Sequence, residues 1–337
     1  MKKDVPSILL VGVGWWGGNH LRILLKLQAM KLCRLVGVQA NNQNVLQYVG
    51  GEFGVKTFCN DQGLEEADAV VIATPTHNHF AIAEKALLAG KDVLIEKPLT
   101  QTLEEAYKLK KIHANSSQIF MVGHTFRYNP AVDCVKKLLS DGEIGNIRFF
   151  RGHFMGLRSK EQDAGILATV AIHFIYTSNY FIGRLPKKVW AKTNYFLDSK
   201  LEDHCLVRLD YNPEFSLIES DYFTPGKWRT FDIIGTQGAI FLDALNQKVE
   251  LHQKRHIYTE CGFEVYDGNT MYPNLEFQEP LYLELSHFVK CVQQRTEPLT
   301  GIEESINVLE IIEAAYESSR SDQTVILDTR PTTERRR

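Results

Sequence analysis

Two short segments carry the residue types and spacing that could do chemistry in this chain. Gly12, Gly14 and Gly17 follow the spacing GxGxxG directly after an apolar run and before a helical pattern. In a dinucleotide-binding loop the first glycine permits a tight turn, the second lets the backbone approach a pyrophosphate, and the third allows close helix packing. The phosphates then rest on amides at the helix N-terminus. The first segment therefore predicts a dinucleotide site.

The second segment ends an apolar run with Glu96, Lys97 and Pro98. Because a proline keeps the residue before it extended, Lys97 is expected at the end of a strand. Open α/β sheets bind ligands at the carboxyl ends of their strands, where an ammonium group can hydrogen-bond the substrate oxygen that gains or loses a hydride. Taken alone, such a lysine is an ordinary surface residue. The glycine loop upstream favours the catalytic interpretation and points to a nicotinamide-dependent oxidoreductase.

The end of the second predicted strand lacks the acid that usually binds the adenosine ribose about 20 residues beyond the glycines. Ala40 and Asn41 stand there instead, and no arginine is present in the segment to attract a 2′-phosphate. Asparagine can hydrogen-bond either ribose hydroxyls or a phosphate. Both NAD and NADP therefore stay open as the cofactor, with a slight preference for NAD.

The elements around these residues alternate along the first part of the chain. Apolar runs expected as strands cover residues 7–13, 33–40, 67–75, 91–98 and 118–124, and helical patterns cover residues 18–28, 78–90 and 102–116. The last helix begins with the capping pair Thr102 and Glu105. Continuous apolar strands alternating with helices predict an α/β domain whose parallel sheet is covered on both faces, here residues 1–123.

After Phe126 the pattern changes to longer strands in which polar and apolar residues alternate. These cover residues 146–156, 188–196, 203–212, 215–223, 228–236, 239–244 and 248–253, with helices expected at 130–142, 165–182, 281–295 and 303–319. They predict an α+β domain, residues 124–330, with a large and mostly antiparallel sheet. Residues 331–337 are expected to form a disordered tail.

The composition of the chain limits the classes of binding partner that are expected. The net charge of −3 gives no reason to expect nucleic acid or an anionic membrane, and no apolar run approaches the length of a membrane span. The six cysteines form no CxxC pair, so no zinc site is expected, and His77 with His79 lacks further metal ligands. Reduced thiols and no secretion signal favour a cytoplasmic protein.

Several longer segments resemble the glucose-fructose oxidoreductase / inositol dehydrogenase (Gfo/Idh/MocA) family. They read GVGWWGGNH, ATPTHNHFAIAEKALLAGKDVLIEKPLT, VGHTFRYNPAVDCVKKLLSDGEIGNIRFF and IIGTQGAIFLD. The resemblance implies a Rossmann domain followed by an α+β domain whose open sheet face mediates homodimers or homotetramers. It implies NAD(P)-dependent hydride transfer to or from a ring carbon of a sugar or sugar derivative. Residues 279–319 further resemble members that act on nucleotide-linked sugars.

The same resemblance implies roles for individual residues. Thr74, Pro75 and His79 would line the cofactor cleft, and Glu96 and Lys97 would flank the nicotinamide, with the Lys97–Pro98 bond expected to be cis. The cofactor would also meet Arg127, and the substrate would meet Tyr128 and Asn129. Independently of the family, Trp15 and Trp16 in the glycine loop could stack near the cofactor, or one could pack beneath the loop.

A helical stretch supplies the last candidates. His173 matches a family histidine, but Thr169 replaces the aspartate expected four residues earlier. Residues four apart share a helix face, so both are expected to face the substrate, with Tyr176 and Tyr180 continuing the polar stripe. Val170, Phe174 and Phe181 form a separate apolar face. The stripe suits a hydroxyl-rich substrate, or else packs at a domain interface. Proton transfer would then fall to Lys97, His173 or Tyr176.

Two alternatives stay open at this point. The missing carboxylates at Ala40 and Thr169 leave room for a cofactor-binding sensor with little redox activity. A hydro-lyase or glycosidase-like enzyme that uses the cofactor transiently is equally compatible with the motifs.

Overall fold

The computed structural model describes residues 5–160 and 163–327, which form two compact units. The first unit contains the residues up to 125 together with residues 279–309, and the second contains residues 126–278 and those from 310 onward. The division at residue 123 stays a prediction of the sequence, and the structure groups residues 279–309 with the first unit. The predicted tail, 331–337, lies outside the described residues.

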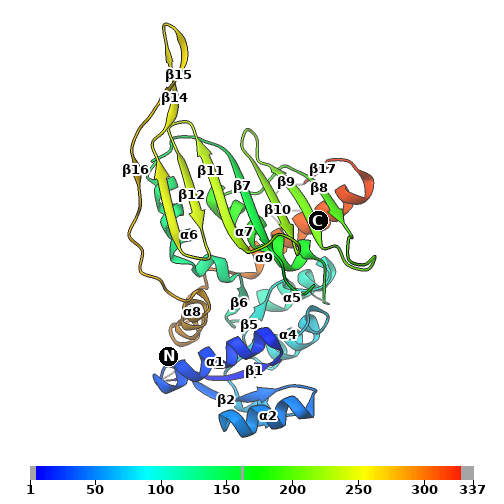
Figure 1. The fold of residues 1–337 in the computed structure, drawn as a ribbon. Helices are drawn as coiled ribbons and strands as arrows, with labels where there is room; N and C mark the ends of the chain where they lie inside the picture. Colours follow the sequence, from blue (N-terminus) through cyan, green and yellow to red (C-terminus); the bar gives the residue numbers. More distant parts are fainter. Residues whose placement is uncertain (1–4, 161–162, 328–337) are drawn as a thin grey trace. The chain divides into compact units, whose positions relative to one another are not determined.

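The first unit is built on a six-stranded parallel sheet with the order β3-β2-β1-β4-β5-β6 (Figure 1). Its strands are β1 (Ser7–Val11), β2 (Arg34–Gln39), β3 (Thr57–Phe58), β4 (Ala69–Ile72), β5 (Asp92–Glu96) and β6 (Phe120–Gly123). Every residue of β1, β4, β5 and β6 is buried, as expected when helices cover both faces of a parallel sheet. The predicted parallel α/β domain is confirmed.

Helices connect these strands. They are α1 (Trp15–Ala29), α2 (Gln43–Phe53), α3 (Gln62–Glu66), α4 (His79–Leu88, preceded by the short helix η1, Thr76–Asn78) and α5 (Leu103–Ala114). The predicted capping box at the start of α5 is present, with Thr102 and Glu105 each bonding the other's backbone amide. Gly90, just after α4, has φ +72°, which glycine adopts without strain and which ends the helix.

The second part of the first unit is α8 (Pro280–Gln294) with the beginning of α9 (Ile302–Ser321). Ile302, Ile306 and Leu309 belong to the same buried apolar cluster as Leu99 and Leu109. The edge strand β6 is joined to this segment by a hydrogen bond of 2.9 Å from the Val122 amide to the Thr300 carbonyl. These contacts are long-range, so the repeating pattern of the strands did not reveal them.

The second unit contains a nine-stranded sheet with the order β16-β13-β12-β11-β7-β10-β9-β8-β17. Its longer strands are β7 (Ile147–Gly156), β8 (Lys188–Asn194), β9 (His204–Asp210), β10 (Phe215–Asp221), β11 (Lys227–Gly235), β12 (Ala239–Asp243) and β13 (Lys248–His252). Only the pair β7 and β10 is parallel among the described ladders of this sheet, so the predicted mostly antiparallel sheet is confirmed.

Three features of this unit were not predicted. The two-residue strands β16 (Thr270–Met271) and β17 (Val325–Ile326) extend the edges of the sheet. A separate hairpin, β14 (Arg255–Thr259) with β15 (Gly262–Tyr266), projects beyond the sheet in Figure 1. The helical segment expected at 165–182 is present, but it begins with a π-helical turn, Leu167–Ala171, before α7 (Ile172–Ile182).

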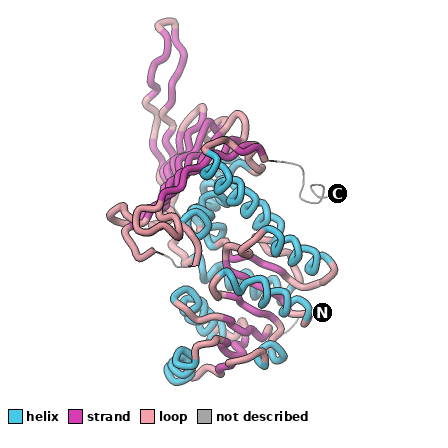
Figure 2. The backbone as a smooth tube through the Cα atoms, turned by 90° about the vertical axis from the view of Figure 1, so that its right-hand side faces the viewer, coloured by secondary structure: helices cyan, strands magenta, loops and turns pink. Residues whose placement is uncertain are grey.

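Helices α6 (Pro130–Ser140) and α7 pack on one face of the nine-stranded sheet, and Figure 2 shows the helices of this unit on one side of its strands. A side chain at Gly152 would bring its Cβ to 2.7 Å from the Phe174 ring, so α7 lies directly on β7. Alternate residues of β7 are buried beneath these helices and half-exposed on the other face. This is the open-faced sheet that the sequence predicts. No described helix has the length and apolar content needed to cross a membrane.

Candidate active site

The glycine loop between β1 and α1 has the geometry its spacing predicts. Gly12 has φ +92°, and a Cβ there would lie 2.6 Å from the Ala73 carbonyl oxygen. A Cβ at Gly17 would lie 2.3 Å from the Gly12 oxygen, whereas a Cβ at Gly14 would meet no atom within 4 Å. The loop is therefore closed at its first and third glycines and open at its second, where a pyrophosphate would approach.

The start of α1 fits an anionic group. Gly14 is its N-cap, with no side-chain capping hydrogen bond and no acidic residue in the first turn, so the amide dipoles there are available to phosphate. At the end of β4, the buried hydroxyl of Thr74 has no hydrogen-bond partner among the described residues. A buried polar atom without a partner is costly, and a bound ligand can supply one. The residues present therefore fit a dinucleotide.

Trp15 and Trp16 lie in different environments. The Trp15 side chain is 84% exposed, whereas the Trp16 indole donates a hydrogen bond of 2.6 Å to Glu96 Oε1. Of the two predicted possibilities, Trp16 therefore packs beneath the loop, and Trp15 stays accessible for stacking.

The end of β2 is open to solvent. Ala40 is half-buried and Asn41 is exposed. Asn42 caps α2 by accepting hydrogen bonds from the amides of Asn44 and Val45, at 3.0 and 3.3 Å. Its side-chain oxygen is thus used within the helix, which leaves Ala40 and Asn41 as the predicted ribose-side positions.

Glu96 is only 4% exposed and lies at the centre of a hydrogen-bond network. Its carboxylate accepts hydrogen bonds from Trp16 Nε1 at 2.6 Å, from His20 Nε2 at 2.8 Å and from the Lys97 amide at 3.2 Å. Burial alone would raise the pKa of Glu96, but the hydrogen bond and charge of His20, with the charge of Lys97 and the Trp16 hydrogen bond, lower it below its usual value. The carboxylate is thus anionic and joins the first turns of α1 to the end of β5, directly before Lys97.

The backbone beside Lys97 is held from two further directions. A Cβ at Gly123 would lie 3.0 Å from Glu96 Oε1, so β6 packs closely against the carboxylate, which would have to shift to admit a side chain there. The Lys97–Pro98 bond is cis, as the family resemblance implies. The buried ring of His79 bridges the Pro98 carbonyl at 2.9 Å and the Thr74 carbonyl at 3.0 Å, while Pro75 is exposed. His79 therefore connects the turn after β4 to the turn after β5.

Three residues near this network carried no predicted role: His20, His124 and Glu284. His124 is buried, which lowers its pKa to about 3, and its Nε2 lies 3.0 Å from the Ser305 hydroxyl. Burial raises the pKa of Glu284 well above its usual range, the Glu96 charge raises it further, and an interaction with Thr125 only partly offsets this. Sequence signals for two of them existed. His20 lies four residues after Trp16 on α1, and Glu284 lies on the apolar stripe of α8 between Leu281 and Phe288.

In the second unit, the segment after Phe126 is tied to its own helices. Arg127 pairs with Asp133 and lies 4.3 Å from the centre of the Tyr180 ring. Tyr128 is buried. Asn129 caps α6 by accepting from the Ala131 amide at 2.9 Å, and it donates to the Ala244 carbonyl at 2.8 Å. The contacts that the structure gives Asn129 are therefore structural ones.

The polar stripe of the helical segment lies in an aromatic environment. His173 is half-buried, with its ring centre 4.9 Å from that of Phe126 and stacked 5.6 Å from that of Phe154. The Thr169 hydroxyl donates to the Gly165 carbonyl at 2.9 Å, and Tyr176 is buried. Because Thr169 sits in the π-helical turn, the α-helical spacing used to place it on the face of His173 does not apply there. Val170, Phe174 and Phe181 are buried, as predicted.

No group of three or more histidine, cysteine or carboxylate side chains arranged to hold a metal ion occurs in residues 5–160 and 163–327.

A parallel sheet in this strand order, with an uncapped glycine loop at its first turn, defines a dinucleotide-binding Rossmann protein. The chain belongs to the Gfo/Idh/MocA oxidoreductase family. The family model for the NAD-binding Rossmann fold matches residues 7–124, and the model for the C-terminal alpha/beta domain matches residues 136–327.

Known relatives match this chain over different lengths. A scyllo-inositol 2-dehydrogenase (NAD(+)) of Bacillus subtilis is 29% identical, covering 97% of this chain and 98% of the relative. A UDP-N-acetylglucosamine 3-dehydrogenase of Acidithiobacillus ferrooxidans is 30% identical, but over only 54% of this chain and 56% of the relative. The solved structure of levoglucosan dehydrogenase with NADH and L-sorbose has the same fold, with a TM-score of 0.84, 20% identity, and coverage of 97% of this chain and 100% of the other.

Proposed function

We propose that this protein is an NAD(P)-dependent dehydrogenase or reductase that transfers hydride to or from a ring carbon of a sugar, polyol or sugar derivative. One observation carries the proposal: the strand that ends directly before Lys97 is fixed to the glycine-loop helix through Glu96, Trp16 and His20. The relative that acts on scyllo-inositol matches over almost its full length, which supports a cyclic polyhydroxylated substrate. Support for a nucleotide-linked sugar comes from a match over about half the chain.

In this proposal each candidate residue has its own role in the reaction. The bound nicotinamide supplies or accepts the hydride. Lys97 hydrogen-bonds and polarises the reacting oxygen, and His173 or Tyr176 moves the proton. The Thr169 hydroxyl donates to the Gly165 carbonyl and carries no charge, so it does not replace the charge of an aspartate. The proton step therefore depends on neutral or cationic side chains.

The proposed binding residues keep the assignments made from the sequence. Those for the cofactor are Gly12, Gly14, Trp15, Trp16, Gly17, Ala40, Asn41, Thr74, Pro75, His79, Glu96, Lys97 and Arg127. Those for the substrate are Tyr128, Asn129, Thr169 and His173. Within these sets, the buried hydrogen bonds of Trp16, His79 and Glu96 indicate that they act by positioning their neighbours.

Titrating the protein with NADH and NADPH by fluorescence, followed by a thermal-shift screen of polyols, sugars and nucleotide sugars with the cofactor bound, tests this function. A ligand present at about 100 times its Kd should add roughly 2.7 kcal/mol of stability. Gly14→Val and Gly18→Val form a matched pair, because a Cβ at either position meets no atom within 4 Å. We expect only Gly14→Val to abolish dinucleotide binding. A wild-type protein that binds neither dinucleotide contradicts the proposal.

We also propose that the open face of the nine-stranded sheet joins copies of this chain as a homodimer or homotetramer. Apolar side chains on that face are half-exposed or exposed, among them Phe149, Leu217, Ile234 and Phe241. Phe241→Glu should shift the mass measured by light scattering toward the monomer, and a monomeric wild-type protein contradicts the proposal. A cytoplasmic location stays a prediction of the sequence.

A further inference from the structure

Three residues of the first unit that have no role so far lie together: Gln39 and Asp61, at or after the ends of strands, and Lys85, on a helix. Gln39 is the last residue of β2, and its carbonyl accepts a hydrogen bond of 2.9 Å from the Gly12 amide, in the dinucleotide loop itself. Asp61 follows β3 and precedes α3, and Lys85 lies on α4. The position where the ribose-binding acid is missing is thus flanked by a carboxylate from the next strand.

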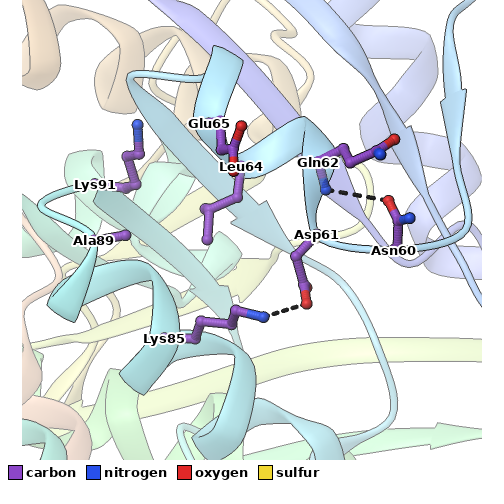
Figure 3. Close-up of a pocket in the computed structure, with 8 residues that line it drawn as sticks. All are labelled: Asn60, Asp61, Gln62, Leu64, Glu65, Lys85, Ala89 and Lys91. Atoms are coloured by element: carbon purple, nitrogen blue, oxygen red, sulfur yellow. Dashed lines mark hydrogen bonds and ion pairs between the residues drawn. The ribbon is translucent and has the colours of Figure 1, made fainter.

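These three side chains are directly connected. Gln39 Nε2 donates a hydrogen bond of 3.2 Å to Asp61 Oδ1. The other oxygen of Asp61 pairs with the Lys85 ammonium, and Figure 3 shows the two side chains pointing toward one another. The hydrogen bond and charge of Lys85, with the Gln39 hydrogen bond, outweigh burial and lower the pKa of Asp61 below its usual value, so it is anionic at neutral pH.

The group lines open space. Gln39, Asp61 and Lys85 border a cavity of about 220 Å³ that is also lined by Val11, the last residue of β1. Asp61 and Lys85 also border a second cavity of about 520 Å³, drawn in Figure 3. Both side chains are about half exposed, so a ligand can reach them.

The hydrogen bonds among Gln39, Asp61 and Lys85 determine which of their atoms remain to bind a ligand. Because the amide nitrogen of Gln39 is used by Asp61, its amide oxygen is the acceptor left for a ribose hydroxyl. A 2′-phosphate would instead need a cation. Lys85 could supply one, but Asp61 neutralises it.

We propose that Asp61 selects NAD(H) over NADP(H), by orienting Gln39 as an acceptor and by pairing with Lys85 so that it cannot bind a 2′-phosphate. Asp61 thereby supplies, from the loop after β3, the carboxylate that is missing at Ala40 after β2. This inference rests on the proposed dinucleotide binding and adds that NAD(H) is the preferred cofactor.

The Kd values for NADH and NADPH, measured by fluorescence titration without substrate, test the inference. Wild-type protein should bind NADH more tightly. Asp61→Asn frees Lys85, and the ratio of Kd(NADPH) to Kd(NADH) should fall at least about tenfold, equivalent to about 1.4 kcal/mol. Adding Lys85→Met to that variant should reverse the fall. Lys85→Met alone should leave NADH binding unchanged and should not improve NADPH binding.

The matched control is Glu66→Gln, which breaks the pair Lys56–Glu66 of similar exposure in the same unit and should leave the ratio unchanged. An unchanged ratio in Asp61→Asn, or an equal change in both variants, overturns the inference while the proposed function stands. A wild-type protein that binds neither dinucleotide overturns the proposed function and this inference together.

Discussion

The candidate catalytic residues of the two units are held in opposite ways. In the first unit, Lys97 follows a buried carboxylate that accepts three hydrogen bonds, and the network is charged and joins helix α1 to the end of β5. In the second unit, His173 lies among phenylalanine rings on a helix that begins with a π-helical turn. A hydrogen-bonded network tolerates little change in its members, whereas an aromatic environment accepts another ring of similar size.

The largest expected effect concerns Lys97, in the charged network of the first unit. Lys97→Ala should lower kcat by at least about 100-fold, because it removes the group that polarises the reacting oxygen. Steady-state kinetics on the substrate found by the thermal-shift screen measures this. Lys108→Ala, which removes an exposed lysine paired with Glu104, is the control and should leave kcat unchanged. Nearly intact turnover in Lys97→Ala would show that the lysine is not catalytic.

Glu96→Gln tests whether the carboxylate holds the network together. Three donors face Glu96, so an amide in its place would turn its own N–H groups toward at least one of them, at a cost of about 1–3 kcal/mol in the free energy of unfolding. Urea denaturation at pH 7 measures the change. A variant as stable as the wild type would mean that the charge of Glu96 contributes nothing net to the free energy of unfolding.

On the aromatic side, His173→Phe and Tyr176→Phe should leave folding intact, since each keeps a ring in place. The variant that removes the proton-transferring residue should have a kcat at least about tenfold lower, and the other variant should lose little activity. Comparing the pH profiles of kcat separates a proton-transfer role from simple positioning. If both variants keep full activity, proton transfer does not involve this helix.

The smallest expected effect, measured at pH 5, concerns Glu284, another buried carboxyl of the first unit. Its pKa is raised in the folded protein, so unfolding releases its proton once the pH exceeds 4.5, the usual value, and stability falls as the pH rises from there. Glu284→Gln removes this loss. The variant should match the wild type at pH 4, be more stable by under about 1 kcal/mol at pH 5, and gain further toward neutral pH. A variant less stable than the wild type at pH 7 would contradict the raised pKa.

The parts of the molecule that could be predicted from the sequence are those fixed by local chemistry. The turn at Gly12, the capping box at Thr102 and the strand that leads to Lys97 each depend on neighbouring residues, and all are present. What could not be predicted depends on residues far apart in the chain. Glu284 reads as one polar residue in an amphipathic helix, and Asp61 as a loop aspartate. Only the folded sheet brings Asp61 to Gln39.

The π-helical turn was missed for a different reason. Leu167–Ala171 is apolar throughout, so its pattern has no period that distinguishes 3.6 from a larger number of residues per turn. Consequently the sequence located the helical segment correctly but gave no sound basis for placing Thr169 on the face of His173.

Residues 279–309 belong to the first unit but come late in the sequence, and this affects how the chain folds during translation. Ile302, Ile306 and Leu309 complete an apolar cluster whose other members are all in the first 122 residues. On the ribosome, part of the interior of the nucleotide-binding unit therefore stays uncovered while more than half of the polypeptide is still being translated. During that interval the nascent chain exposes an apolar surface that chaperones would recognise, and a stop codon near residue 278 would leave both units incomplete, because the second unit also includes residues after 309.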